Sequence, residues 1–151
     1  LQGHFIGMLL VGEPGSGKTT LLRSIARELV RQHKILSVID ERRELFAGNI
    51  HGEGLGVLAG LPKGQAVQMA LRSLSPQVIL LDELGGLDEV TALEQGLFSG
   101  VDFIATLHAA TPEEATMRPQ VKYLMERGAV RVLVWLTGRQ APGCIGEVRF
   151  L

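Results

Sequence analysis

The sequence has few of the features that mark membrane-spanning or disulfide-bonded proteins. It contains one cysteine, Cys144, in 151 residues. A single cysteine excludes an internal disulfide framework and suits a reducing compartment. The apolar runs, such as Val78 to Leu81 and Val132 to Leu136, fall far short of the roughly 20 residues that span a bilayer. We therefore expect no transmembrane helix and a cytoplasmic location.

Features that recognise nucleic acids or guanine nucleotides are also scarce. The net charge of −1 provides no general basic field for a polyanion. The stretch from Gly48 to Gly64 has Lys63 as its only lysine or arginine, and it has no aromatic residue for base stacking. The one asparagine, Asn49, precedes isoleucine, so the guanine-reading motif Asn-Lys-x-Asp is absent. We expect no nucleic-acid partner and no specificity for GTP.

The composition is that of one folded domain. Hydrophobic residues make up 46% and charged residues 21% of the chain, which is typical of a globular protein. A chain of this length holds one ordinary domain, so residues 1–151 are predicted to form a single one. Because the chain begins at Leu1 and not at a methionine, we expect it to be a piece of a longer protein.

Short apolar runs alternate with segments of helical spacing, which predicts an α/β domain with a mostly parallel central sheet flanked by helices. The expected strands are Phe5 to Val11, Ile35 to Ile39, Val78 to Leu81 and Val101 to Ala105, and a C-terminal antiparallel hairpin joins Ala129 to Leu136 with Glu147 to Leu151. The expected helices are Leu21 to His33, Gly64 to Leu74, Asp88 to Phe98, and one capped by Thr111 and interrupted at Pro119. The glycine-rich stretch from Phe46 to Gly64 is expected to be a long mobile loop or a disordered connector.

A phosphate-binding loop follows the first expected strand. The residues from Gly12 to Thr19 satisfy the pattern G-x-x-x-x-G-K-[ST] between a strand and a helix. Backbone N–H groups of such a loop surround phosphate oxygens, while Lys18 reaches the terminal phosphates and Thr19 offers a hydroxyl to Mg²⁺. The residues expected to contact ATP are Gly12, Glu13, Pro14, Gly15, Ser16, Gly17, Lys18, Thr19 and Thr20.

Two acids end the buried strand Val78 to Leu81, at the edge where a parallel sheet places its ligand-binding residues. Asp82 is predicted to hold the Mg²⁺ shell, directly or through water. Glu83 is suitably placed to orient and deprotonate an attacking water. Beside the phosphate-binding loop, this pair predicts hydrolysis of ATP with Mg²⁺.

Two further strand ends carry polar residues at the same edge. The segment Asp40 to Glu44 fits a second catalytic carboxylate at Glu41, and it equally fits a solvated strand end whose charges pair with one another. His108 follows the strand Val101 to Ala105 and is predicted to lie near the γ-phosphate as a sensor of the nucleotide state. The remaining histidines have no comparable placement, and no Cys/His cluster resembles a zinc site.

Taken together, these motifs resemble the RecA-like motor domain of secretion ATPases of the VirB11/PilT type. The resemblance covers nearly the whole chain and includes Asp40-Glu41-Arg42, Asp82-Glu83 and Thr106-Leu107-His108-Ala109. It implies a RecA-like P-loop NTPase fold, an acidic box at Asp40 and Glu41, a Walker B glutamate at Glu83 and a histidine box at His108. It also implies a ring-forming hexamer, coupled to a membrane secretion complex at the inner face of the membrane.

Two departures from that pattern carry consequences. Type II and type IV secretion motors commonly have Gly-Glu where this chain has Asp82 before Glu83, which agrees better with a sporulation branch of the family. The N-terminal domain that such motors use for coupling is not in the chain, so this fragment is expected to lack force transmission. The alternatives are a RecA-like DNA motor and a nucleotide-binding switch with little turnover.

Overall fold

A parallel sheet forms the centre of the protein, whose computed structural model describes residues 7–42, 54–98, 100–137 and 143–151. Within these ranges the sheet has seven strands in the order β3-β2-β4-β5-β1-β6-β7. Every neighbouring pair is parallel except β6 and β7, which are antiparallel. The strands are β1 Gly7–Gly12, β2 Leu36–Asp40, β3 Leu55–Ala59, β4 Val78–Leu81, β5 Asp102–His108, β6 Val132–Leu136 and β7 Ile145–Phe150.

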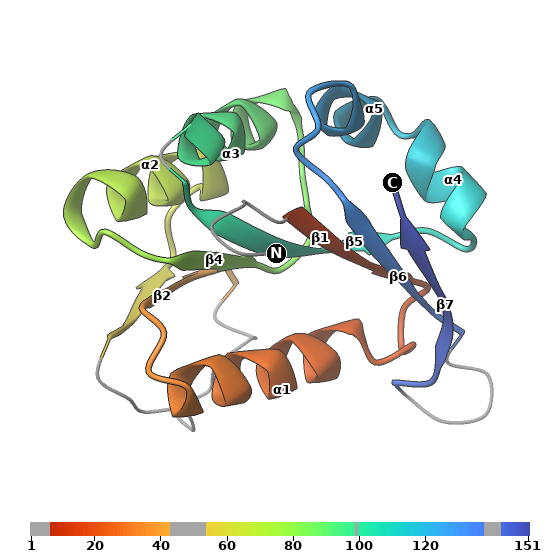
Figure 1. Ribbon diagram of the computed structural model, residues 1–151, viewed down its shortest axis with the longest axis horizontal. Helices are drawn as coiled ribbons and strands as arrows, with labels where there is room; N and C mark the ends of the chain where they lie inside the picture. Colours follow the sequence, from red (N-terminus) through yellow and green to blue (C-terminus); the bar gives the residue numbers. More distant parts are fainter. Residues whose placement is uncertain (1–6, 43–53, 99, 138–142) are drawn as a thin grey trace.

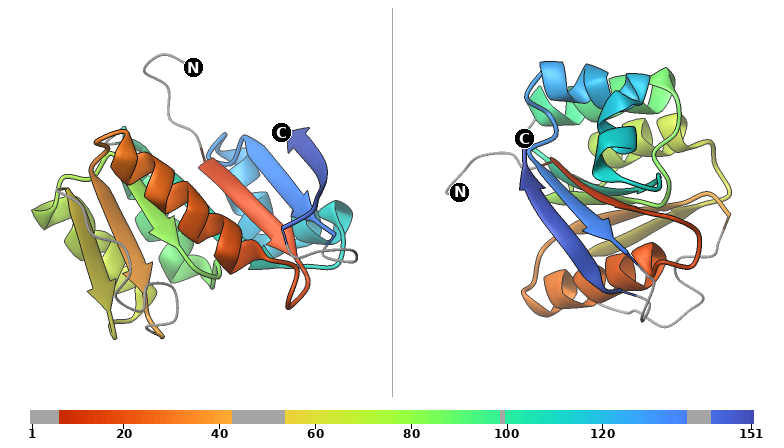
Figure 2. Two further views of the ribbon diagram at one scale, coloured as in Figure 1. Left: turned by 90° about the horizontal axis from the view of Figure 1, so that it is seen from below. Right: turned by 90° about the vertical axis from the view of Figure 1, so that its right-hand side faces the viewer.

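Helices cover both faces of this sheet. One face carries α1, and the opposite face carries α2 to α5 (Figure 1). The left view of Figure 2 looks onto the α1 face, with β3 and β7 at opposite edges. None of the helices in the described ranges combines the length and apolar character needed to cross a membrane. The helices are α1 Lys18–Arg31, α2 Lys63–Ser73, α3 Leu87–Phe98, α4 Pro112–Met117 and α5 Pro119–Glu126.

The strands supply a separate apolar core to each face because their side chains alternate in direction. In β1, Leu9 and Val11 belong to the core beneath α2 to α5, whereas Leu10 packs into the core beneath α1. In α1, Leu22 and Ala26 lie four residues apart and are fully buried against the same core as Leu10. Strands buried on both faces explain why their sequences are continuous apolar runs and not alternating ones.

This architecture confirms the predicted fold class. The strand predicted from Val78 to Leu81 has those bounds in the structure, and the other predicted strands and helices agree to within a few residues where they are described. The predicted C-terminal hairpin is present as β6 and β7. Pro119 separates α4 from α5 as expected, because a proline at the first position of α5 cannot continue the preceding helix.

The prediction of a long loop from Phe46 to Gly64 is wrong in part. Residues 55–59 form β3, which pairs in parallel with β2 from Leu36↔Leu55 to Asp40↔Ala59. This strand is easily missed, since it contains Gly56, lies at the sheet edge and is only partly buried. Residues 46–53 of the predicted loop lie outside the described residues.

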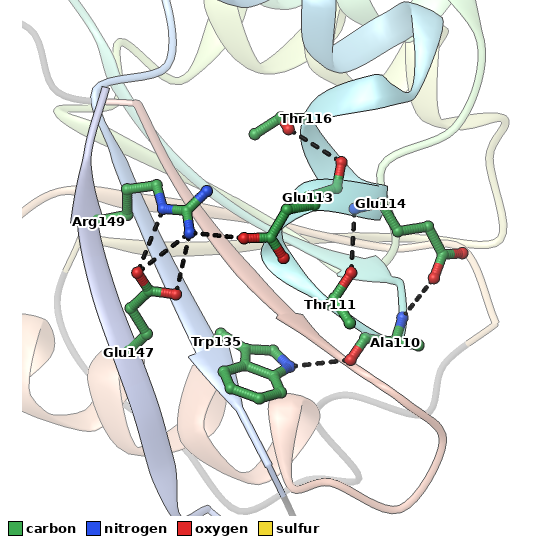
Figure 3. A network of polar contacts seen from close by, with 8 residues as sticks. All are labelled: Ala110, Thr111, Glu113, Glu114, Thr116, Trp135, Glu147 and Arg149. Carbon is green, nitrogen blue, oxygen red and sulfur yellow. Dashed lines mark hydrogen bonds and ion pairs between the residues drawn. The ribbon is translucent and has the colours of Figure 1, made fainter.

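The start of α4 confirms Thr111 as its cap. Thr111 Oγ1 accepts a hydrogen bond from the Glu114 N–H at 3.1 Å. The Glu114 carboxylate accepts from the N–H of Ala110 at 2.8 Å, one residue before the cap (Figure 3). Trp135 of β6 donates its indole N–H to the Ala110 carbonyl at 3.1 Å, which ties the segment after β5 to the hairpin.

Phe103 in β5 is among the largest fully buried side chains and is 1% exposed. We expect Phe103→Ala to lower the free energy of unfolding by about 3–5 kcal/mol, because it removes buried apolar contacts and leaves a cavity. The same change at Phe150, which is 79% exposed on β7, is the matched control and should have little effect. Urea unfolding monitored by circular dichroism measures both, and equal losses would contradict this account of the core.

Candidate functional site

The loop between β1 and α1 has the backbone geometry that the phosphate-binding motif requires. Gly15 and Gly17 have φ values of 78° and 96°, in the left-handed region that favours glycine. Gly17 is the N-cap of α1 and has no side chain that could cap the helix. The N-terminus of α1 adjoins the loop, and the helix dipole favours an anion there.

A cleft of about 400 Å³ opens at this loop. A volume of this size is ordinary for a small-molecule site. The cleft is lined by Pro14, Gly15, Gly17, Lys18, Thr19 and Thr20. All of these residues were predicted from the sequence to contact ATP, and the cleft brings them together.

Close packing fixes the base of the loop. A Cβ on Gly12 would overlap the hydroxyl of Ser16 and would lie 3.0 Å from the carbonyl oxygen of Leu136 at the end of β6. The Ser16 carbonyl accepts a hydrogen bond from the Gly143 N–H at 2.8 Å. The Ser16 hydroxyl is buried and has no hydrogen-bond partner within the described part of the chain. Such an unsatisfied group at a phosphate-binding loop is a natural partner for a bound oxyanion.

Lys18 lies within the loop and close to the two acids after β4. Its ammonium donates to the carbonyls of Gly12 and Glu13 at 2.7 and 2.9 Å. Burial lowers the pKa of Lys18 from its ordinary value, while Asp82, Glu83 and Glu13 act in the opposite direction. Lys18 and the two acids follow β1 and β4, which end at the same edge of the sheet on either side of β5.

Strand pairing places Thr106 beside these acids. The pairing Leu81↔Ala105 brings the residue after Ala105 next to Asp82. The Thr106 hydroxyl donates to Asp82 Oδ1 at 2.8 Å and accepts from the Glu83 N–H at 2.6 Å. Thr106 is 1% exposed, so these contacts are made in a nearly dry environment. Thr106 thus fixes the direction of the Asp82 carboxylate.

Both candidate general bases line one small cavity at the carboxyl ends of β2 and β4. This cavity has a volume of about 40 Å³. Its lining residues are Asp40, Glu41, Arg42, Lys63, Asp82 and Glu83. The structure therefore brings Glu41 and Glu83 to the same place, as the sequence predicted for strand ends at a common edge. Arg43 and Glu44 lie outside the described residues.

A buried carboxylate fixes the turn that follows the two acids. Glu89, near the start of α3, accepts a hydrogen bond from the Gly85 N–H at 2.6 Å. Burial raises the pKa of Glu89, and Asp88 and Glu41 raise it further, whereas the Gly85 N–H and Lys63 act to lower it. A side chain on Gly85 would collide with the Glu89 carboxylate and force it to move.

His108 lies at the same edge as the phosphate-binding loop. It ends β5 and pairs with Gly12, the last residue of β1. The next residue, Ala109, donates its N–H to the Gly12 carbonyl at 3.2 Å. The His108 carbonyl accepts from Arg118, which also forms an ion pair of 3.1 Å with Glu114. The His108 side chain is exposed, and its role as a nucleotide sensor stays a prediction.

The oxygen donors at this edge fit Mg²⁺ bound together with a nucleotide. Among the described residues, no group of three or more His, Cys, Asp or Glu could hold a metal ion alone. Mg²⁺ usually keeps several waters and binds through one or two carboxylates and substrate phosphates. The Thr19 hydroxyl in the cleft and the oriented Asp82 carboxylate would supply such a partial shell.

Comparison with solved structures defines the class. The ATPase DotB of Legionella pneumophila matches with a TM-score of 0.71 and 25% identity, over 87% of this chain and 40% of that one. The VirB11 ATPase of the Brucella suis type IV secretion system matches with a TM-score of 0.66 and 22% identity, over 96% of this chain and 48% of that one. The fold is that of the secretion ATPases.

The sequence then narrows the class to a family. Residues 3–149 match the family described as sporulation stage III, protein AA, and the chain belongs to this family. The stage III sporulation protein AA of Bacillus subtilis is 31% identical in an alignment of 159 positions that covers 97% of this chain. The chain spans 52% of the length of that protein. These findings confirm the resemblance to a sporulation branch of the secretion ATPases.

Several residues of the site were missed by sequence reasoning. Thr106 belongs to the motif Thr106-Leu107-His108-Ala109, in which the sequence predicts a role only for His108. The sequence predicts no role for Lys63, the single lysine or arginine of a glycine-rich stretch, or for Glu89. The Thr-x-His spacing after a strand was an available signal for Thr106, because alternate residues of a strand share one side. Lys63 and Glu89 reach the site from helices that the sequence does not place there.

We expect Gly12→Ala to lower the free energy of unfolding by about 1–3 kcal/mol, because the added Cβ forces the Ser16 side chain or the end of β6 to move. Gly86→Ala is the matched control, since a Cβ there meets only Asp88 at an ordinary contact distance of 3.4 Å. Chemical denaturation compares the two. Equal stability of both variants would show that the base of the loop is not closely packed.

Proposed function

We propose that this domain binds ATP with Mg²⁺ and hydrolyses it. The observation that supports this most strongly is that the loop of Lys18 and the acids Asp82 and Glu83 follow parallel strands that end at one edge of the sheet. A phosphate-binding loop alone would serve a nucleotide-binding switch equally well. A metal-binding acid with a second carboxylate beside it adds what hydrolysis requires, namely a held Mg²⁺ and a base for water.

In this proposal each group of residues has its own role. Backbone N–H groups from Gly15 to Thr19 bind the phosphates, and Lys18 neutralises the charge of the terminal ones. Thr19 and Asp82 hold Mg²⁺, which neutralises charge that develops on the phosphates when it is bound. Glu83 orients the attacking water and accepts its proton. His108, at the end of β5, senses whether the terminal phosphate is present.

We further propose that the domain acts as a motor within a sporulation-associated secretion complex. Membership of the sporulation stage III, protein AA family and the fold shared with DotB and VirB11 support this proposal. A homo-oligomeric ring, hexameric as the family resemblance implies, and a place at the inner face of the membrane belong to the same proposal. Coupling of ATP hydrolysis to that complex is part of the same proposal.

We expect Lys18→Ala to bind ATP at least tenfold more weakly, about 1.4 kcal/mol, because the ammonium is the main side-chain charge facing the terminal phosphates. Isothermal titration calorimetry with Mg²⁺ and ATP measures the change. Lys122→Ala removes an exposed ammonium on α5 and is the matched control. Parental affinity in the Lys18 variant would remove the assignment of the phosphate-binding loop.

Glu83→Gln should keep ATP affinity near the parental value while turnover falls on the order of 10² or more, because the amide keeps the shape but cannot accept the proton. Asp82→Asn should weaken Mg²⁺-dependent binding as well. Single-turnover hydrolysis of pre-bound ATP separates these effects.

Glu41→Gln is the comparison that identifies the base, since Glu41 lines the same cavity as Glu83. Glu126→Gln, an exposed position at the end of α5, controls for loss of a carboxylate elsewhere. A larger loss of turnover in the Glu41 variant than in the Glu83 variant would transfer the role to Glu41.

Stimulation of hydrolysis by single-stranded DNA would favour a DNA motor over a secretion motor.

A further inference from the structure

Glu83 has a backbone conformation that its place in the fold does not explain. Its φ of 63° lies in the left-handed region, which residues other than glycine rarely adopt. His33 and Ser75, the other non-glycine residues with positive φ in the described ranges, each follow the last turn of a helix, where this conformation is common. Glu83 follows the strand β4 instead, so it needs other contacts to hold it.

Side chains from two separate elements hold the polar groups of the Glu83 backbone. The Glu83 N–H donates to the hydroxyl of Thr106, in β5, at 2.6 Å. The Glu83 carbonyl accepts from the ammonium of Lys63, the first residue of α2, at 2.6 Å. Both peptide groups next to the Glu83 side chain are therefore fixed, one from the sheet and one from a helix.

Thr106 also links Glu83 to the predicted metal ligand. A hydroxyl has a single proton, and that of Thr106 is donated to Asp82 Oδ1 at 2.8 Å, which leaves its lone pairs for the Glu83 N–H. The Thr106 carbonyl accepts from the Leu84 N–H at 2.7 Å. One buried residue thus orients three consecutive residues after β4.

We propose that Thr106 and Lys63 are positioning residues that act through Glu83. They hold its backbone in the left-handed conformation and thereby set the direction of its side chain, at the cavity that Glu83 and Glu41 both line. Thr106 in addition fixes the Asp82 carboxylate for Mg²⁺, whereas Lys63 does not contact Asp82 in any hydrogen bond of the described residues. This inference rests on the proposed function, since it takes Glu83 as the base.

Thr106 forms hydrogen bonds with both Asp82 and Glu83, whereas Lys63, within the described residues, forms one with Glu83 and none with Asp82, so their variants should differ in the Mg²⁺ requirement. Thr106→Val keeps the shape but loses the hydroxyl, and we expect turnover at saturating ATP to fall about 10- to 100-fold. The Mg²⁺ concentration that gives half of the maximal ATP binding should rise about tenfold in the same variant. Thr106→Ser keeps the hydroxyl and should restore both quantities. Lys63→Met should lower turnover to a similar extent but leave the Mg²⁺ requirement at the parental value.

The Mg²⁺ requirement is measured by calorimetric titration of ATP at a series of Mg²⁺ concentrations, which is independent of hydrolysis. Thr116→Val and Lys122→Met make the same chemical changes on α4 and α5, and both should match the parent. Circular dichroism checks folding. If Thr106→Val does not fold, the Thr106→Ser and Lys63→Met variants still decide the question.

A double variant that carries both Lys63→Met and Glu83→Gln tests whether Lys63 acts through Glu83. If it does, Lys63→Met adds no further loss of turnover to Glu83→Gln. If instead the two losses of turnover multiply in the double variant, Lys63 acts on the nucleotide directly, and the proposal is overturned. Parental turnover in Thr106→Val and Lys63→Met, with turnover lost in Glu83→Gln, would overturn it while leaving the proposed function intact. A parent that does not hydrolyse ATP would remove both.

Discussion

The functional edge of this domain depends on one constraint, the parallel pairing of β1 between β5 and β6. This pairing places Gly12 opposite His108 on one side and opposite Leu136 on the other. Because parallel strands all end at the same edge, it also brings the loop after β1 to the acids after β4. Residues far apart in the sequence meet there without any long loop reaching across the sheet. A shift of β1 by one residue would turn its buried side chains to the opposite face of the sheet.

The edge concentrates features that are unfavourable for stability, and the rest of the fold supplies apolar burial. Ser16 keeps a buried hydroxyl without a partner in the described part of the chain, and Glu83 keeps a left-handed backbone. Lys18 is partly desolvated, so its ammonium depends on carbonyls and nearby acids. Such local costs persist only where the surrounding structure enforces them, and they are typical of sites prepared for a ligand. Two cores, one on each face, provide that support.

The central strands and the phosphate-binding loop were predictable because their signals are local. Four apolar residues before Asp82 predict a buried strand, and the motif from Gly12 to Thr19 specifies both a backbone shape and a ligand class. The strand β3 was not predictable in this way. It is a partly exposed edge strand with Gly56, and its sequence has neither a continuous apolar run nor regular alternation. The roles of Thr106 and Lys63 depend on strand register and on where α2 begins. The sequence predicts the start of α2 to within one residue, and the Thr-x-His spacing indicates a shared side of β5, but neither signal shows which strand ends lie beside these residues in space.

The contacts of the Glu83 backbone support the proposal that Glu83 is the base. Glu83 and Glu41 line the same cavity. Thr106 and Lys63 bind the two sides of the Glu83 backbone, and Thr106 joins it to Asp82. A general base acts best when it is already oriented, because reorganisation during the reaction then adds little to the barrier. The left-handed backbone of Glu83, held beside the proposed metal ligand Asp82, is therefore an argument for the proposal that Glu83 is the base.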